Sequence, residues 1–410
     1  MKKVVISRAR TFTQASGRRP PPKLPPLTFD GLWHNVGFRS LFYQILVIGV
    51  VVSTAVYMIG NAQVAMEKLG ISTGFGFLTE EASFAIGESL INYDSSDTYI
   101  RAYLVAILNT LKVSAVSVVG ATVLGVIIGI ARLSTNYLIS KSASIYIEIF
   151  RNTPQLVQII FWYTLVTRLP HPKQAWDLFD WVFISNRGLV IAWPTDGAVF
   201  SWVGLAFFIA CGGAYGVIQW ADTRRRHIGK TTRVLWWNVG LIFGLPLLVW
   251  FALGSPMDMD VPIFKGFNFT GGIALSPEFL ALLLGLSLYI AAFIAEIVRS
   301  GIQAVSRGQI EAARSVGLGR TDLYMKVILP QALRVIVPPA TAQYVSLTKN
   351  SSLGVAIGYP ELFNINNTIT TTSGNTIECI SIMMAVYLSI AFTIAVIMNV
   401  YNQAVQIKER

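Results

Sequence analysis

The chain has 410 residues, of which 53% are hydrophobic and 13% charged, and its net charge is +11 at neutral pH. Because the apolar residues form long runs, this composition excludes an ordinary soluble protein and predicts an all-α polytopic membrane protein. Most of the basic residues lie between apolar runs, which indicates topology signals and argues against a nucleic-acid partner. With two cysteines and three scattered histidines, we expect neither a disulfide framework nor a metal site.

The first 100 residues combine a basic tail, an apolar run and an acidic segment. Residues 1–40 are rich in proline and do not have the form of a cleavable signal peptide. We predict a flexible cytoplasmic tail that helps to fix topology; an arm that binds anionic lipid headgroups or a protein is the alternative. The run at 41–60 predicts a first membrane span, and the acidic, base-poor segment 61–100 indicates the outer side.

Seven more spans are predicted, which makes eight. The second, at 102–131, would be about 45 Å long as a helix and should project beyond the bilayer at its outer end. The seventh begins near Gln331, and Pro338, Pro339 and the polar residues after them should interrupt it around 338–352. The remaining five are expected at 154–170, 200–220, 234–253, 277–298 and 379–402.

The distribution of lysine and arginine orients these spans. With eight spans and both termini in the cytoplasm, the cytoplasmic segments contain 24 of the 32 basic residues. The strongest inside signal is the short loop between the fourth and fifth spans, which contains Arg224, Arg225, Arg226, Lys230 and Arg233. One span more or fewer would put the termini on opposite sides and spoil this agreement.

A charged segment separates the sixth and seventh spans and cannot lie in hydrocarbon. It covers residues 311–330 and reads EAARSVGLGRTDLYMKVILP. Ala312 and Ala313 favour a helix, Gly317 permits a sharp turn, and a second short helix can follow at 320–327. We therefore predict a helix–turn–helix unit at the cytoplasmic membrane surface; a loop that only anchors the interface is the alternative.

This segment resembles the EAA loop of ABC-importer permeases, through which the membrane subunit docks on its ATPase. The residues that carry the resemblance are Glu311, Ala312, Ala313, Gly317, Leu329 and Pro330. Val327 stands where the family usually has isoleucine, an equivalent apolar residue. The resemblance implies that Glu311 pairs with a basic group of the ATPase and that Gly317 sets the elbow between two coupling helices. Pro330 can begin the next helix at little cost.

A second short pattern looks like a nucleotide site but fails as one. Gly229, Lys230 and Thr231 resemble the end of a phosphate-binding loop, but Arg224 stands at the position of its first glycine and no strand precedes it. We therefore expect no nucleotide site, no cofactor and no enzymatic activity in this chain. ATP and Mg²⁺ would be bound by a separate ATPase subunit.

Two further segments resemble the amino-acid branch of the permease family. The first reads IFRNTPQLVQIIFWY and contains the signature residues Arg151, Asn152, Thr153, Pro154 and Gln158. Pro154 can start a helix that Thr153 caps. A capped helix start at the inner interface, with Arg151 on lipid phosphates, is the alternative.

The second segment of this type reads YVSLTKNSSLGVAIGYPEL and lies near the end of an apolar span. Its candidate path residues are Lys349, Asn350, Ser351 and Ser352. Broken backbone at membrane depth must line a cavity or be buried in protein, and polar groups there suit a zwitterionic solute. A Lys349 side chain that only reaches the outer interface is the alternative.

Other polar residues in or near the spans are weaker candidates. Asn109 and Thr110 of the second span are included among the candidate path residues. Glu296 and Arg299 are spaced to pair on one helix face, and a structural ion pair is expected there. Glu361 is a candidate contact for an external partner.

The five-span core of the family would occupy residues 101–170 and 277–410, with the coupling loop at 307–330. Outside this core lie the tail 1–40, an extra span with an outer segment at 41–100, and an insertion with two spans at 171–276. These additions resemble the enlarged general L-amino-acid permeases of Gram-negative bacteria. The resemblance implies an inner-membrane location, a second homologous permease in a heterodimer, two ATPase subunits and a periplasmic amino-acid-binding protein.

The function expected from these observations is that of the permease subunit of an ATP-driven amino-acid importer that works by alternating access. An ion-coupled secondary amino-acid transporter would explain the spans and the buried polar groups, but not the segment that begins at Glu311. A permease-like membrane sensor is the other alternative.

Overall fold

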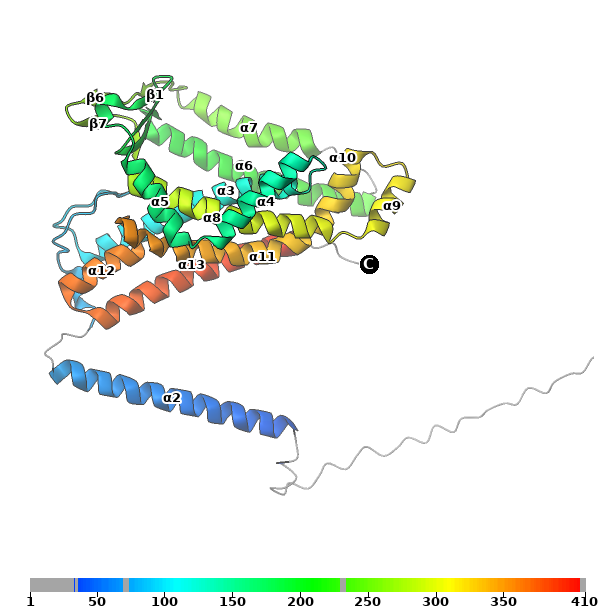
Figure 1. Ribbon diagram of the computed structural model, residues 1–410. Coiled ribbons are helices and arrows are strands. Elements are labelled where there is room, and N and C mark those ends of the chain that lie inside the picture. The colour runs from blue at the N-terminus through cyan, green and yellow to red at the C-terminus, as the bar shows by residue number, and fades with distance from the viewer. Residues whose placement is uncertain (1–32, 34–35, 69–73, 229–233, 406–410) are drawn as a thin grey trace, which may run out of the picture. The chain divides into compact units, whose positions relative to one another are not determined.

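The computed structural model describes residues 33, 36–68, 74–228 and 234–405, and helices dominate it (Figure 1). The chain forms two compact units, Met1–Ser72 and Thr73–Arg410. The first contains α2 (Val36–Lys68), whose part Val36–Ala62 is apolar and long enough to cross a membrane. This confirms the first predicted span. Nearly all of the predicted tail at 1–40 lies outside the described residues.

The second unit contains the other long helices. They are α3 (Tyr99–Arg132), α4 (Tyr137–Asn152), α5 (Gln155–Thr167), α6 (Gly197–Ile228), α7 (Val234–Ala252), α8 (Pro277–Gln303), α11 (Leu329–Asn350) and α13 (Thr376–Val405). The short helices α9 (Arg307–Ser315) and α10 (Arg320–Leu323) lie at one end of this unit, which we call the loop end (Figure 1). The strands and α12 (Leu362–Ser373) lie at the opposite end, the sheet end.

Length and composition support five membrane-crossing helices among the described residues: α2, α3, α6, α8 and α13. These coincide with the first, second, fourth, sixth and eighth predicted spans. α5 and α7 are apolar but shorter, and α11 does not meet the same criterion. The predicted total of eight spans is therefore not established.

The third predicted span, 154–170, corresponds to α5 alone, which has 13 residues and is only about 20 Å long. The segment before it was expected to be a cytoplasmic loop, but it forms α4. α4 extends from the loop end to Asn152, and α5 continues towards the sheet end, so the two helices together cover the distance that α8 covers alone (Figure 1). Pro154 separates them, because it has no N–H to continue the hydrogen-bond ladder.

The seventh predicted span is broken at the far end of the range expected, 338–352, and not at its two prolines. α11 continues through Pro338 and Pro339 to Asn350, and the break follows it as a 3-10 turn at Ser351–Ile357. Both prolines are exposed, and a membrane helix tolerates proline where neighbouring groups satisfy the freed carbonyls. Gly358 ends the turn with a φ of 80°, a left-handed conformation that glycine adopts at no steric cost.

α8 is the centre of the unit and packs closely against α3. The contact face of α3 has small residues at every fourth position, Ser117, Ala121, Gly125 and Gly129. A Cβ on Gly129 would lie 2.7 Å from the carbonyl oxygen of Ala295, so no larger residue fits between the two backbones. Small residues that let helix backbones approach are typical of packing inside membranes.

The insertion at 171–276 contains short strands that the all-α prediction did not include. β1 (Trp176–Leu178), β2 (Val182–Ser185), β3 (Gly188–Ile191) and β8 (Ile273–Leu275) form an antiparallel sheet in that order. Two smaller pairs join β4 (Trp193–Pro194) to β5 (Met259–Asp260) and β6 (Ile263–Lys265) to β7 (Asn268–Thr270). Pairing of β3 with β8 ties the start of the insertion to the residues that immediately precede α8.

Candidate functional site

The segment between α8 and α11 is a bent helical unit at the loop end. α9 carries Glu311, whose side chain is exposed, and ends just before Gly317, whose φ is 80°. The N–H of Gly317 donates to the carbonyl of Arg314 (2.9 Å), and that of Leu318 donates to Ala313 (3.2 Å). These bonds satisfy the free carbonyls at the end of α9, so the left-handed glycine forms the predicted sharp turn.

An apolar cluster holds α9 rigidly against the neighbouring helices. Its buried members are Val305, Ala313, Leu323, Ile328 and Ala332. Ala313 faces this cluster and is 6% exposed, whereas Ala312 beside it is exposed. The two alanines therefore differ in environment: Ala313 is packed against the neighbouring helices, and Ala312 is exposed beside Glu311.

A helical segment covers the predicted range 320–327, but it is not a separate short helix, because it continues into α11. α10 passes through a π-helical turn at Tyr324–Ile328 directly into α11, with Pro330 in the first turn of α11. Leu329 is 40% exposed beside it. No glycine or other turn residue separates α10 from α11.

The α4–α5 break and the end of α11 meet inside the bundle. The amide nitrogen of Asn350 donates to Oε1 of Gln155 (2.7 Å), which joins residues 195 positions apart. The hydroxyl of Tyr146 in α4 donates to the carbonyl of Leu288, and Ile159 in α5 packs on Gly285. Both contacts fall near the middle of α8, so the α4–α5 break and the end of α11 meet about halfway along the bundle.

The α4–α5 break is stabilised by Gln158. Its amide nitrogen donates to the carbonyls of Phe150 (3.0 Å) and Thr153 (3.1 Å), which have no partner within α4. Thr153 does not cap α5 as predicted; its hydroxyl donates back to the carbonyl of Ile149 (2.8 Å). Pro154 precedes α5 in an extended conformation and offers no side-chain acceptor.

Two cations lie beside this break with exposed side chains, Arg151 at the end of α4 and Lys349 at the end of α11. The guanidinium of Arg151 lies 5.2 Å from the centre of the Phe293 ring. Asn152 is exposed next to it. The site therefore combines broken backbone, amide groups and two positive charges, which could bind a carboxylate.

The serines that follow Lys349 form hydrogen bonds to backbone carbonyls. The hydroxyl of Ser351 donates to Thr348 (2.7 Å) and that of Ser352 donates to Lys349 (2.8 Å), which satisfies carbonyls at the end of α11. Ser351 is fully buried, and Ser352 is half-buried. In this conformation they shape the break, whereas Asn350 bonds across it to Gln155.

Asn109 and Thr110 lie elsewhere, at the sheet end, and both are fully buried. The amide nitrogen of Asn109 donates to the carbonyls of Glu88 (2.8 Å) and Pro360 (3.0 Å). The hydroxyl of Thr110 accepts from the N–H of Leu362 (2.9 Å). The structure therefore does not bring these residues together with the α4–α5 break.

Glu361 was considered as a contact for an external partner, and that expectation is wrong. Its side chain is fully buried and accepts from the N–H groups of Phe363 (2.9 Å) and Asn364 (2.8 Å), which caps α12. The hydroxyl of Tyr387 in α13 donates to the same carboxylate (2.9 Å). The short sequence PEL gave no sign of this, because the partner hydroxyl belongs to a distant helix.

The expected ion pair between Glu296 and Arg299 is present. Nε of Arg299 donates to Oε2 of Glu296 (2.9 Å), and a second guanidinium nitrogen contacts the other carboxylate oxygen. Arg299 also donates to Gln303 in the next turn of α8. The pair is thus a bidentate structural contact within α8.

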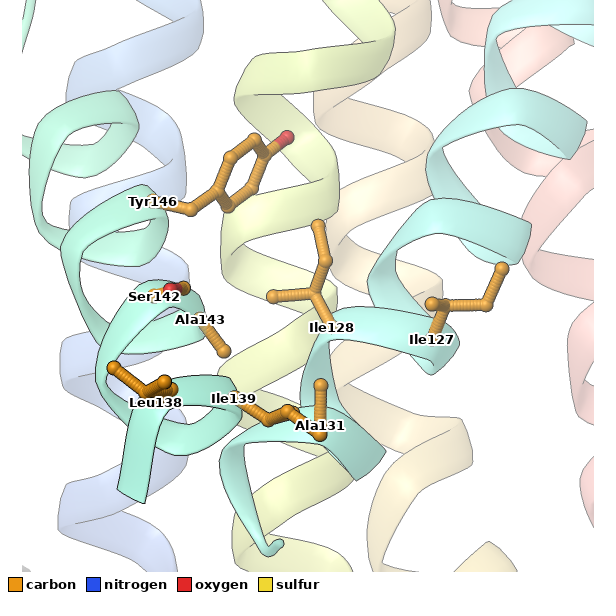
Figure 2. Close-up of a pocket in the computed structure, with 8 residues that line it drawn as sticks. All are labelled: Ile127, Ile128, Ala131, Leu138, Ile139, Ser142, Ala143 and Tyr146. Carbon is orange, nitrogen blue, oxygen red and sulfur yellow. The ribbon is translucent and has the colours of Figure 1, made fainter. Parts of the chain in front are cut away.

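An apolar groove of about 440 Å³ lies between α3 and α4 towards the loop end (Figure 2). Figure 2 labels its lining residues: Ile127, Ile128, Ala131, Leu138, Ile139, Ser142, Ala143 and Tyr146. The Tyr146 hydroxyl is already bonded to α8, which leaves Ser142 as the only free polar side chain in the lining. Such a surface suits hydrocarbon and offers nothing to a charged solute.

Residues 224–408 match the family described as the inner membrane component of binding-protein-dependent transport systems. The chain is 47% identical to a putative amino-acid ABC transporter permease protein, YhdX, of Escherichia coli K12, over 92% of this chain and 96% of the relative. It is 42% identical to the general L-amino acid transport system permease protein AapQ of Rhizobium johnstonii, over 93% and 96%. A crystal structure of an amino acid ABC transporter with histidines is similar over 75% of this chain and 95% of that one (21% identity, TM-score 0.44).

The chain therefore belongs to the permeases of binding-protein-dependent ABC importers, as the segment from Glu311 to Pro330 predicted. This is a membrane subunit without enzymatic activity, in a family whose members work with a separate ATPase and a substrate-binding protein. The long relatives place it in the amino-acid branch, beside permeases of general L-amino-acid transport systems. They support neither the secondary-transporter nor the sensor alternative.

Proposed function

We propose that this chain lines one side of a path for L-amino acids and that the path passes the point where α4, α5 and α11 break. The observation that carries the proposal is the hydrogen bond between Gln155 and Asn350 (2.7 Å), which brings the two segments of amino-acid type together. Discontinuous helices near the middle of a membrane protein are a recurrent way of building a solute site. Exposed Arg151 and Lys349 beside the break would attract the carboxylate of the solute.

The relatives support a proposal for the class of solute. Two of them are named for general L-amino acids and for glutamate, glutamine, aspartate and asparagine, the latter from Rhodobacter capsulatus at 37% identity over 92% of this chain. We propose a similarly broad set of polar or acidic amino acids. Two cations and two amides at the break suit such side chains better than they suit purely apolar ones.

We further propose that the loop end lies in the cytoplasm, with both termini on that side, in a bacterial inner membrane. The exposed face around Glu311 would dock on one of two ATPase subunits, which bind the ATP and Mg²⁺. A second, homologous permease would complete the path as a heterodimer, because E. coli K12 has a further relative, YhdY, at 32% identity over 45% of this chain. A periplasmic amino-acid-binding protein would deliver the solute at the sheet end.

Coupling would follow from the rigidity of the loop end. α9 is fixed to α8 and α11 by the cluster around Ala313, and α10 is continuous with α11. Closure of the ATPase dimer would therefore move α11, and with it Asn350, as one lever. This connects nucleotide binding directly to the break where the solute passes.

The test is ATP-dependent uptake by the assembled complex in liposomes. Glu311→Gln should reduce both uptake and retention of the ATPase at least tenfold, since a desolvated ion pair at an interface is costly to break. Asp322→Asn is the matched control, because Asp322 is an exposed carboxylate of the same segment that pairs locally with Lys326 (2.8 Å). Normal coupling in Glu311→Gln would contradict the proposed docking role.

A further inference from the structure

Residues 74–98, which we call the outer strap, fold over the sheet end of the helices. The N–H of Gly74 donates to Glu378 of α13 (2.7 Å), and the amide of Asn375 donates to the carbonyl of Gly74 (3.1 Å). Phe77 and Ala82 are buried in an apolar cluster with α3, α12 and α13. The strap is therefore part of the packed core and not a free loop.

One strap residue, Glu88, joins two helices of the core. Its Oε1 accepts from Nζ of Lys112 in α3 (2.5 Å), and its Oε2 accepts from the hydroxyl of Ser276 (2.5 Å). Ser276 is the N-cap of α8, where its oxygen also accepts from the N–H of Phe279 (3.1 Å). Through its carbonyl, Glu88 also accepts from Asn109 (2.8 Å). A single carboxylate thus ties the strap to both α3 and α8.

This ion pair is well shielded from solvent. The side chains of Lys112 and Glu88 are 17% and 15% exposed, and the ammonium lies 4.5 Å from the centre of the Phe279 ring. The ion pair between Asp97 and Arg101 is longer, more exposed and local in the sequence. Nε of Arg101 lies 3.2 Å from Oδ2 of Asp97, the Asp97 and Arg101 side chains are 31% and 44% exposed, and the two residues are only four positions apart. Pairs of that exposed, local kind contribute little.

A hollow of about 400 Å³ lies between the strap and the core. The strap contributes Phe84, Ile86 and Glu88, and the core contributes Ser276, Glu278 and Asn364. The volume is of the size that holds small-molecule ligands, so an amino acid could pass there. Because the strap forms one wall of the hollow, moving the strap would open it.

We propose that the outer strap is a gate at the sheet end of the path and that Glu88 is its latch. The inference rests on the proposed transport function. The gate opens when Glu88 leaves Lys112 and Ser276, and each group then regains water. An intact pair that separates into water recovers its hydration, so separating the pair itself costs little. Removal of one partner instead leaves a shielded charge unpaired. A contact that is easy to separate but costly to lose by substitution suits a latch that must break and re-form in every transport cycle.

The first test measures ATP hydrolysis by the complex of this chain, its partner permease and the ATPase, in liposomes without binding protein. Glu88→Gln and Lys112→Met should each raise this rate about tenfold, which corresponds to about 1.4 kcal/mol. The double variant with Glu88→Lys and Lys112→Glu keeps an ion pair with the charges exchanged. It should bring the rate of ATP hydrolysis most of the way back to the low wild-type value. Asp97→Asn removes a carboxylate from the same strap and should change the rate less than twofold. Wild-type rates in both single variants would overturn the proposal.

A second test holds the gate shut and does not depend on the stability of those variants. Glu88→Cys and Lys112→Cys are combined with alanine at both native cysteines and bridged by a bifunctional methanethiosulfonate reagent. ATP-driven uptake of tritiated L-amino acids should stop in the bridged complex and return when a reductant cleaves the bridge. Uptake that continues after bridging would overturn the gate. Absence of ATP-driven uptake in the wild-type complex would instead refute the proposed function.

Discussion

Replacement of Gln158 by leucine should destabilise the permease, because two partly buried carbonyls would lose their donor. The side chain is 6% exposed, and its amide nitrogen serves Phe150 and Thr153 at 3.0 and 3.1 Å. An unsatisfied buried acceptor costs about 1–3 kcal/mol, and a partly buried one costs less than the upper end of this range. Two partly buried acceptors, offset by the apolar gain of leucine, give about 2–4 kcal/mol. ATP-driven uptake should also fall, since Gln158 stabilises the α4–α5 break, which lies on the proposed path.

The assay for this prediction is the apparent melting temperature of the purified complex at one fixed scan rate. At about 2–4 °C per kcal/mol for a large domain, Gln158→Leu should lower it by about 4–16 °C. The matched control is Gln219→Leu on α6, where an exposed amide donates only to the Tyr215 hydroxyl (2.9 Å). Equal melting temperatures for the two variants would refute the role assigned to Gln158 at the break.

Four further substitutions test the packing and the site. Gly129→Leu should prevent accumulation of the folded permease, because a Cβ there would already lie 2.7 Å from the α8 backbone; Gly216→Leu, where the space is open, should be tolerated in the same expression assay. Ala313→Leu should detach α9 and abolish ATPase retention, and normal retention would contradict the rigid lever. Arg151→Gln and Lys349→Gln should each raise the KM for L-glutamate uptake about tenfold, by analogy with loss of a charge-assisted bond of about 1.5 kcal/mol. An unchanged KM in both would remove these cations from the path.

The amino-acid sequence determined the class of protein and the position of its coupling segment. Both are local properties: the apolar runs at α2, α3, α6, α8 and α13 are long enough by themselves. The turn at Gly317 was likewise predictable, because only a glycine accepts its left-handed backbone without strain. Family membership followed from residues that lie within twenty positions of one another, between Glu311 and Pro330.

Other parts of the fold were misjudged from the sequence. The segment 154–170 was predicted to span by itself, but α5 has only 13 residues, and only its position after α4 beside α8 shows that the two helices act together. The interruption of α11 was predicted around 338–352, partly because proline usually breaks helices, but α11 continues through both prolines and the break begins only at Ser351. The strands of the insertion have at most four residues, too few for a clear alternating pattern.

The contacts that define the site depended wholly on tertiary structure. Gln155 meets Asn350 across 195 residues, and Glu88 meets Ser276 across 188, distances at which no sequence spacing indicates a neighbour. Burial is equally non-local: Glu361 was expected to face a partner, yet α12 and α13 enclose it. Hydropathy and turn chemistry act over a few residues, so the sequence reveals spans and turns. Pairing of polar groups depends on which helices pack together, and only the folded chain decides that.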